Sequence, residues 1–592
     1  MKKKYVLFLF VLVATVMTFI SYSSSLKGEF VWDDRFLVLD NTYVKNWTEV
    51  PNIFITNMGQ GADRPYSYWR PLQIFTYVLD YSFWKLNPLG YHLTNVLLHI
   101  LVAVCLYHFS YILFADSALS FIAGIFFVVH PIHTEAVSYI SGRADLLSAL
   151  FVLLGLIFYI EYLKSERMLS YLLMFSCFIL ALLSKENSLV FPLLVLLYHL
   201  FFAKRIKITL FIPIAAVSLI YIFLRLTILK SALLHVYRVS GFFQRIPAFF
   251  AAIFNYTRLL LIPVGLHMDY GTPSFKFTDS EVLIGLFLCI LFLGYAFKQR
   301  RDNKLIAFSI FWFFITLIPV SGIYALPFYM AEHFLYLPSV GFFLIITYII
   351  LRIFSDSKKL KGVATVVICG SGVLLTVLCY RQNQYWRTPI SLYTRIIQFN
   401  PSTRWAYNNL GNAYLKKGML KEAKIAYMKA LQISPDNARL YNNLGYIYLI
   451  QRNYDESLKM LMKAVELYPR YTKAYYNLGL LYIAKGREKE AVEFFMKVIE
   501  INPYYAEAYY HLGNIFRRRG KIEEAIGFYK AAIEVNPQYA KVYNHLAVLY
   551  YSLGECNIAV EYCNKALSLG YAVDIRFLER IIRSCGKEKP EK

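Results

Sequence analysis

Charged residues are scarce in this chain of 592 residues, at 17% of the sequence. Soluble globular proteins carry about 25%. Hydrophobic residues reach 58% and the mean hydropathy is +0.45, which excludes a soluble protein for most of the length. The net charge of +24 does not indicate a nucleic-acid partner, because the Lys and Arg residues lie mainly in short clusters between apolar runs and along the C-terminal helices. No nucleic-acid partner is predicted.

Cysteine is also rare and follows no framework. The chain has eight cysteines, and those inside apolar runs behave as small hydrophobic groups: Cys105, Cys177, Cys289, Cys369 and Cys379. Their spacing predicts neither disulfides nor a metal framework. The sequence also lacks a Walker loop and a dinucleotide-binding glycine motif. A soluble nucleotide donor therefore has no recognisable binding site.

Long apolar runs are what the sequence has instead. Taking about 17 to 25 apolar residues as one crossing, we predict an all-α polytopic bundle of about eleven spans. The runs lie near residues 5–22, 92–114, 118–130, 144–164, 169–184, 188–203, 207–229, 281–298, 304–323, 333–354 and 361–380, and several of them are short for a full crossing. The basic clusters between them then face the cytoplasm. No clear Ala-x-Ala cleavage site follows the first run, so we expect a retained helix with a cytoplasmic N-terminus.

The run 248–266 needs separate treatment, because a crossing there would place the basic cluster at 298–304 outside. We expect instead a helix at the outer interface, within an outer segment 230–280. The predicted domains are a membrane domain at 1–380 with an outer loop at 23–91, a linker helix at 381–400 and an array at 401–592. The array then lies on the exoplasmic side of an integral membrane protein, at the plasma membrane if the source is bacterial.

Two adjacent carboxylates, Asp33 and Asp34, directly follow the first apolar run and so lie at the membrane surface. Carboxylates there are costly to desolvate and often mark functional sites. On the assigned topology, other polar groups at the ends of apolar runs emerge on the same side: Arg64, Arg70, His130, His133, Glu135, Arg143, Asp145, Lys185, Glu186, Asp269, Glu332 and His333. A transporter would place such residues near the bilayer midplane. A cluster at one face suits an active site for a lipid head group.

Several of these residues also have purely structural explanations. Arg143 with Asp145, and Lys185 with Glu186, are close enough in sequence to form local ion pairs. His130 and His133 can anchor a helix at the interface, and no third zinc ligand stands at a recognisable distance from them. No metal site is predicted, although a carboxylate pair together with a phosphate could hold a divalent ion.

Glycosyl transfer from a polyprenyl-phosphate sugar is the chemistry that fits these groups. A carboxylate at the surface can accept the proton of an acceptor hydroxyl while an oxocarbenium-like centre develops at the sugar carbon. The leaving lipid phosphate gains charge as the bond breaks, and Arg and Lys side chains can stabilise it. No cofactor is predicted beyond this lipid-linked donor, which is itself a substrate.

Beyond residue 380 the composition changes, and prolines recur every 34 residues at 401, 435, 469, 503 and 537. This period is the length of a tetratricopeptide repeat, and Leu-Gly pairs recur in the same register. We predict an α-solenoid of about five repeats. Polar residues occupy one register of the first helices, namely Asn409, Asn443, Asn477, His511 and His545. Such a ladder can hydrogen-bond the backbone of an extended acceptor peptide, although asparagine also occurs in these positions for reasons internal to the helix.

Several segments resemble the transmembrane and tetratricopeptide-repeat-containing O-mannosyltransferases, a family of the GT-C superfamily that is related to the protein O-mannosyltransferases. They are Val31-Trp-Asp-Asp34, His130-Pro-Ile-His-Thr-Glu-Ala-Val137, Gly142-Arg-Ala-Asp-Leu-Leu147, Ser184-Lys-Glu186 and Ala331-Glu-His-Phe-Leu-Tyr-Leu-Pro-Ser-Val-Gly341. The resemblance covers nearly the whole chain, because the repeat array follows the membrane part in both. It implies a GT-C-like membrane domain, a dolichyl or bacterial polyprenyl phosphate-sugar donor, and a catalytic acidic pair at Asp33 and Asp34 with Asp33 as the base.

One position departs from the family pattern, which has Ala-Glu-Arg where this chain has Ala331-Glu-His333. A fixed positive charge is thereby replaced by a titratable one. This weakens the expectation that His333 contacts the donor phosphate.

The sequence thus predicts a membrane glycosyltransferase that transfers a sugar, with mannose expected, to Ser or Thr hydroxyls of exported proteins. In this prediction the array binds the acceptor protein. Two alternatives stay open: a non-enzymatic membrane scaffold or transporter that uses the repeats to recruit partners, and an enzyme that glycosylates lipid or polysaccharide.

Overall fold

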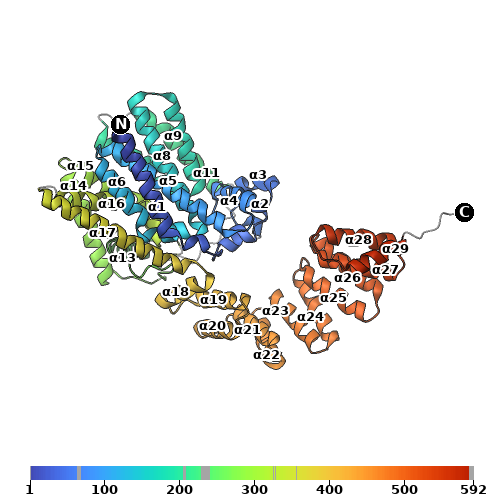
Figure 1. Ribbon diagram of the computed structural model, residues 1–592. Coiled ribbons are helices and arrows are strands. Elements are labelled where there is room, and N and C mark those ends of the chain that lie inside the picture. The colour runs from blue at the N-terminus through green and yellow to red at the C-terminus, as the bar shows by residue number, and fades with distance from the viewer. Residues whose placement is uncertain are drawn as a thin grey trace. The chain divides into compact units, whose positions relative to one another are not determined.

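The computed structural model describes residues 2–62, 64, 68–203, 208–227, 241–271, 273–323, 326, 328–354 and 357–585. Within these ranges the chain forms helices and no strands, which confirms the predicted all-α class (Figure 1). Contacts divide it into two compact units, Met1–Thr403 and Arg404–Lys592. The first unit holds the apolar helices and the second holds the repeats.

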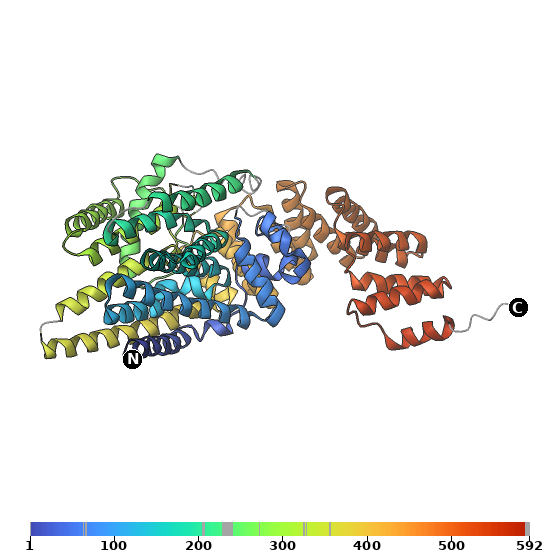
Figure 2. The same cartoon turned by 90° about the horizontal axis from the view of Figure 1, so that it is seen from above.

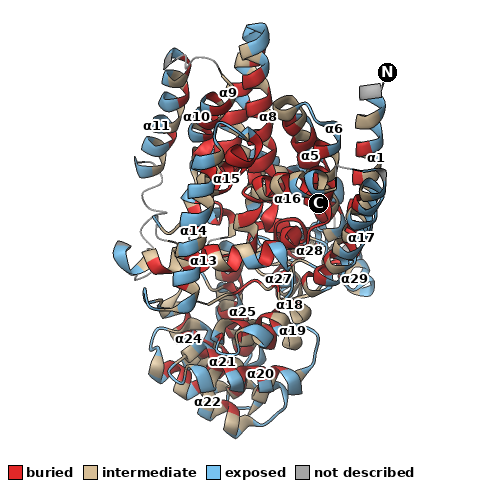
Figure 3. Ribbon diagram, turned by 90° about the vertical axis from the view of Figure 1, so that its left-hand side faces the viewer, coloured by how far each residue is buried: buried red, intermediate tan, exposed pale blue. Residues whose placement is uncertain are grey.

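Five helices of the first unit are long and apolar enough to cross a membrane: α1 (Lys2–Tyr22), α5 (Pro88–Phe114), α8 (Arg143–Ser165), α14 (Ser280–Gln299) and α17 (Lys358–Asn383). A sixth candidate is a pair bent by 54°, in which α6 (Ser117–Val129) is followed by Pro131–Ser138. The length and hydropathy of these helices identify the chain as a membrane protein. In Figure 3, buried residues concentrate where α5, α8 and α16 (Ser339–Ile353) pack, whereas much of α14 is exposed.

The prediction of about eleven spans was wrong for full-length crossings, because five or six helices meet that test. The other apolar runs form helices of 17 residues or fewer, namely α9 (Met168–Ser184), α10 (Phe191–Phe202), α11 (Phe211–Thr227), α15 (Lys304–Leu317) and α16. An α-helix rises about 1.5 Å per residue, so such a helix falls short of an apolar layer about 30 Å thick. The hydropathy of the sequence indicates the apolar run, but it does not indicate the short 3₁₀ segments at the ends of the helices, such as η7 (Glu186–Val190) and η9 (Ile318–Val320).

The loop after α1 folds into short helices rather than extending freely. It contains α2 (Thr42–Lys45), α3 (Val50–Ile55) and α4 (Pro71–Trp84). Asn41 caps the first of these by accepting a hydrogen bond from the backbone N–H of Tyr43. The apolar side chains of this loop form a small core with Tyr77 of α4 and Ile140, so the loop is packed onto the membrane unit.

Helix α13 (Phe242–Leu261) covers most of the run 248–266. It packs so closely against α14 that a Cβ on Gly285 would lie 1.8 Å from the carbonyl oxygen of Phe250. The segment that follows α13 carries His267, Asp269 and Tyr270 without regular structure. Residues 230–240 and residue 272 of the predicted outer segment lie outside the described residues.

The second unit consists of five helix pairs, from α19 (Arg404–Lys416) through α28 (Cys556–Ser568), and is closed by α29 (Ile575–Cys585) (Figure 2). The remaining helices are α20 (Leu420–Ile433), α21 (Ala438–Ile450), α22 (Tyr454–Leu467), α23 (Thr472–Ala484), α24 (Glu488–Ile501), α25 (Ala506–Arg518), α26 (Ile522–Val535) and α27 (Ala540–Ser552). The Leu-Gly glycines allow the first four pairs to pack closely, since a Cβ on Gly479 would lie 2.6 Å from the ring of Phe495. The predicted linker helix is α18 (Pro389–Phe399), which belongs to the first unit.

Candidate active site

A buried segment that folds back on itself, residues 130–145, organises the polar groups of the first unit. It consists of η5 (Pro131–His133), α7 (Thr134–Ser138), η6 (Ile140–Gly142) and the first turn of α8. Gly142 makes the fold possible, because a Cβ there would lie 2.5 Å from the carbonyl oxygen of Ala136. As a result Ser141 and Arg143 are held in fixed positions beside the loop after α1.

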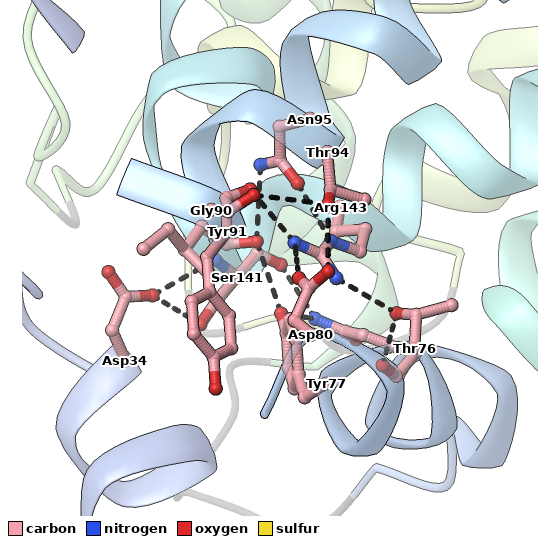
Figure 4. Close-up of polar contacts among 12 residues, drawn as sticks. Asp34, Thr76, Tyr77, Asp80, Gly90, Tyr91, Thr94, Asn95, Ser141 and Arg143 are labelled. Carbon is pink, nitrogen blue, oxygen red and sulfur yellow. Dashed lines mark hydrogen bonds and ion pairs between the residues drawn. The ribbon is translucent and has the colours of Figure 1, made fainter. Parts of the chain in front are cut away.

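Asp34 links that loop to the folded-back segment (Figure 4). Its Oδ1 accepts hydrogen bonds from the backbone N–H of Ser141 at 2.9 Å and from the Ser141 hydroxyl at 2.6 Å. Its Oδ2 accepts a third from the N–H of Val31 at 3.0 Å. The residue is fully buried, and this burial raises the pKa of the Asp34 carboxyl to about 7 against the lowering effect of the three donors.

Asp33 stands beside Asp34 but is only partly buried. The turn that presents it is strained, since Trp32 has φ +46°, a conformation that side-chain-bearing residues rarely adopt. Trp32 is held there by stacking on Tyr139, whose ring stacks in turn on Trp386, with centroids 5.8 Å and 5.7 Å apart. Strain that is maintained by surrounding contacts is a recognised feature of functional turns.

Arg64 is one of the exposed cations of this loop. Its guanidinium lies 3.5 Å from the ring centroid of Phe36, three residues after Asp33. A cation over an aromatic face is oriented without losing its charge, so Arg64 remains available to an anion.

Arg143 is fully buried and is satisfied within the protein (Figure 4). It forms an ion pair with Asp80 at 2.6 Å and donates to the side chain of Asn95 at 2.7 Å. Further bonds run to the Thr76 hydroxyl and the Tyr91 carbonyl. The suggested local pair of Arg143 with Asp145 was therefore wrong, and the true partner comes from α4. Asp80 was missed because a single acid in an apolar helix gives no spacing signal.

Asp145 pairs instead with Lys185, whose ammonium lies 2.7 Å and 2.8 Å from the two carboxylate oxygens. The suggested local pair of Lys185 with Glu186 was wrong as well. Arg70 donates two hydrogen bonds to the Glu186 carboxylate in a bidentate contact, at 2.7 Å and 3.1 Å. The guanidinium of Arg225 in α11 lies 3.8 Å from the same carboxylate. Two arginines around one carboxylate leave one net positive charge there. Arg225 was not singled out from the sequence.

Glu135 of the folded-back segment belongs to a second group of carboxylates. His333 approaches Glu135 with Nδ1 at 2.9 Å from Oε1, and its backbone N–H donates to Oε2 at 2.9 Å. Its neighbour Glu332 accepts from the Tyr270 hydroxyl at 2.8 Å and from the backbone N–H of His267. Burial raises the pKa of the Glu332 carboxyl well above its usual value, and the charge of Glu135 raises it further.

The remaining predicted residues of the first unit have internal partners. Asp269 accepts from the backbone N–H of Gly271 and from the Thr403 hydroxyl. His133 is fully buried, with Nδ1 near the Phe127 carbonyl and Nε2 near the Ser339 hydroxyl. His130 lies near the Leu260 carbonyl. In the part of the chain that the structure describes, no group of three His, Cys, Asp or Glu side chains could hold a metal ion.

In the array, the predicted ladder forms hydrogen bonds between successive repeats. Asn443 donates to Asn408 at 3.2 Å and Asn477 donates to Asn442 at 2.8 Å. His511 lies 3.2 Å from the Tyr476 hydroxyl and His545 lies 3.2 Å from that of Tyr510. Asn409 accepts from Asn408 within its own helix. The ladder thus links neighbouring repeats, and part of its hydrogen-bonding capacity is already used.

Comparison with known proteins gives matches to repeat-family models and to whole proteins. Models described as tetratricopeptide repeats match residues 405–437, 436–503, 494–527 and 540–570, and one described as a TPR repeat matches residues 513–554. A protein O-mannosyl-transferase of Caenorhabditis elegans is 29% identical over 434 residues, which cover 70% of this chain and 61% of that protein. The human protein O-mannosyl-transferase TMTC3 is 28% identical, and the match covers 66% of this chain and 48% of that protein. The chain is a homologue of protein O-mannosyl-transferases.

Further homologues with the same name have identities down to 24%, and they include human TMTC1 at 27% over 69% of this chain. The chain spans about half to three fifths of the length of the first of these homologues. Among solved structures, a crystal structure of MamA is 29% identical, with a TM-score of 0.25, and covers 27% of this chain and 94% of its own.

Proposed function

We propose that this chain is a membrane glycosyltransferase that moves a sugar, mannose by homology, from a polyprenyl phosphate to Ser or Thr hydroxyls of exported proteins. The names of its homologues support the transfer to protein. The observation that carries the proposal is that two adjacent carboxylates have different environments. Asp33 is partly buried on a strained turn, whereas Asp34 is buried and accepts three hydrogen bonds.

Asp33 is the catalytic base of this proposal. Its carboxylate takes the proton of the acceptor hydroxyl as the oxygen attacks the anomeric carbon, and the bond from that carbon to the phosphate oxygen breaks. Asp34 is the positioning residue. Anchored to Ser141, it fixes the turn so that Asp33 stays within reach of the hydroxyl.

Cations at the same site stabilise the leaving polyprenyl phosphate. Arg64 is exposed and oriented on Phe36, so we assign the phosphate contact to it. Arg70 and Lys185 already contact carboxylates. In this proposal the net positive charge of the group formed by Arg70, Arg225 and Glu186 acts on the phosphate from a distance. His333 supplies a positive charge only when it is protonated.

The array would bind the acceptor protein through the ladder of its first helices, chiefly Asn409 and Asn443, which keep partly exposed side chains. The matching topology has the N-terminus in the cytoplasm and the array on the exoplasmic side, together with the active-site loop. In a bacterial cell this would be the plasma membrane.

Reconstitution tests the proposal. The full chain in vesicles with polyprenyl phosphate-mannose and a Ser/Thr-rich peptide should add a hexose to the peptide, as seen by mass spectrometry. Supplying the sugar as a nucleotide donor should give no product. A hexose found only on lipid would replace protein with lipid as the acceptor, and absence of product with any lipid-linked sugar would refute the enzyme.

A further inference from the structure

A cavity of about 600 Å³ opens beside the ends of α1 and α17. These two helices are neighbours, as Figures 1 and 2 both show. None of the lining residues belongs to the candidate active site. Its lining includes the apolar residues Ile20 of α1 and Val377 of α17, which we call the floor. It also includes Tyr380, Arg381, Gln384 and Tyr385, which we call the rim.

The position of the cavity matches a membrane interface. The two candidate spans end beside it, at Tyr22 and at Trp386. Tyrosines are enriched at this depth of a bilayer, where the ring contacts apolar groups and the hydroxyl contacts water. The cavity therefore lies where the acyl chains of a lipid give way to its head group.

The floor continues as an apolar surface along both helices. On α1, Leu12, Val16 and Ile20 follow at four-residue spacing and are about half exposed, at 50%, 50% and 53%. On α17, Val373 and Val377 repeat the spacing and are also exposed. Residues four apart share one helix face, so the two faces together form an uncovered apolar strip that runs into the cavity.

The rim carries one positive charge and no negative one. Arg381 is exposed, and in the described part of the chain no acid forms an ion pair with it. Gln384 and the two tyrosines add neutral hydrogen-bond donors. A single guanidinium with hydroxyl and amide donors is suited to one phosphate group.

We propose that this cavity binds an anionic phospholipid, with its phosphate on Arg381 and its acyl chain along the strip of α1 and α17. The apolar strip favours a lipid over free phosphate, because free phosphate would leave the strip uncovered. The lipid would brace the α1–α17 pair at the level where Asn383 of α17 donates to the Ser21 carbonyl at 2.8 Å and contacts Ser138 of α7. Ser138 belongs to the segment that holds Glu135 and Ser141.

Native mass spectrometry of the purified full chain tests this binding. Phosphatidylglycerol and phosphatidylcholine with the same acyl chains are titrated separately. Wild type should bind phosphatidylglycerol about fivefold more tightly, the size expected of one partly exposed charge contact. Arg381→Gln should bring the two lipids to within about twofold of each other, because it removes that contact.

Arg387→Gln is the matched control, since Arg387 is an exposed arginine six residues further on that does not line the cavity. It should keep the wild-type preference. Equal affinity for both lipids in wild type, an equal loss in both variants, or displacement of the lipid by inorganic phosphate would each overturn the proposal. The measurement uses no glycosyl transfer, so its outcome is independent of the proposed function.

Discussion

Asp33 and Asp34 show how differently two adjacent identical side chains can be used. Asp34 is buried and accepts three hydrogen bonds, two of them from Ser141. Asp33 is partly exposed on the turn that these bonds hold. The sequence could single out the acidic pair as a candidate site, and the resemblance implied which acid would be the base. The sequence could not identify Ser141 as the hydrogen-bond partner of Asp34, because a serine more than a hundred residues away gives no pattern that connects it with Asp34.

Replacement of Asp33 by Asn should abolish transfer while leaving the fold intact. Asn keeps the shape but cannot accept the hydroxyl proton, so we expect the rate to fall about 10²–10⁴-fold. The loss should appear in kcat, measured with labelled polyprenyl phosphate-mannose, and the thermal midpoint should stay near wild type. Asp40→Asn is the control, because Asp40 lies in the same loop and pairs with the exposed Arg35. A fully active Asp33→Asn variant would remove Asp33 from catalysis.

The environment of Asp34 predicts a pH dependence of stability. Its folded-state pKa of about 7 lies above the usual 3.8, so folding favours the protonated form. The stability that this contributes is complete below the unfolded pKa and is lost as pH rises through about 7. The thermal midpoint of the chain should therefore decrease as the pH rises from about 4 to about 7, and Asp34→Asn should reduce this slope.

Ser141→Ala gives a sharper test of the same contact. The Ser141 hydroxyl donates to the Asp34 carboxylate and so favours its ionised form. Removing it should raise the pKa of Asp34 further, and the fall in thermal midpoint should move to higher pH. A shift to lower pH, or a slope unchanged in both variants, would show that another group causes the dependence.

At the scale of elements, the repeats were predictable and the broken membrane helices were not. The 34-residue period of the sequence directly predicts the five helix pairs from α19 to α28. Hydropathy, in contrast, merges a helix with an adjoining 3₁₀ turn, as it does for α15 and η9, and several of the predicted runs were shorter than a full crossing, so the span count was too high. The ion pairs show the same limit. Arg143 with Asp80 and Lys185 with Asp145 join different helices, whereas linear spacing suggested nearest neighbours.

The packing of α13 on α14 can be tested with a matched pair of glycines on one helix. Gly285→Ala would place a methyl group 1.8 Å from the Phe250 carbonyl oxygen, so α13 must move away. We expect a loss of about 1–3 kcal/mol in stability. Transfer should also fall, because the segment after α13 carries His267 and Tyr270, which contact Glu332. Gly294→Ala on the same helix meets no atom within 4 Å and should be neutral in both measurements. Equal effects of the two substitutions would contradict this close contact.

The whole molecule consists of two units, each with its own core. The large apolar clusters around the candidate site lie entirely within Met1–Thr403, and each repeat cluster lies within Arg404–Lys592. A unit that contains its own core is expected to fold without the other. Chemistry and acceptor capture should therefore be separable by cutting the chain between them.

A chain that ends at Thr403 should keep the chemistry and lose the acceptor preference. The cut preserves the hydrogen bond from the Thr403 hydroxyl to Asp269, so the site should remain intact. On a short Ser/Thr peptide, which has little length to span a repeat array, kcat/KM should stay within about threefold of the full chain. On a long unfolded acceptor protein, KM should rise at least about tenfold, because the array no longer raises the local acceptor concentration. If the truncated chain were soluble in detergent, monodisperse and equally impaired on both acceptors, the array would instead be needed for the chemistry. If it were unimpaired on both, the ladder of Asn409, Asn443 and Asn477 would have another partner than the acceptor.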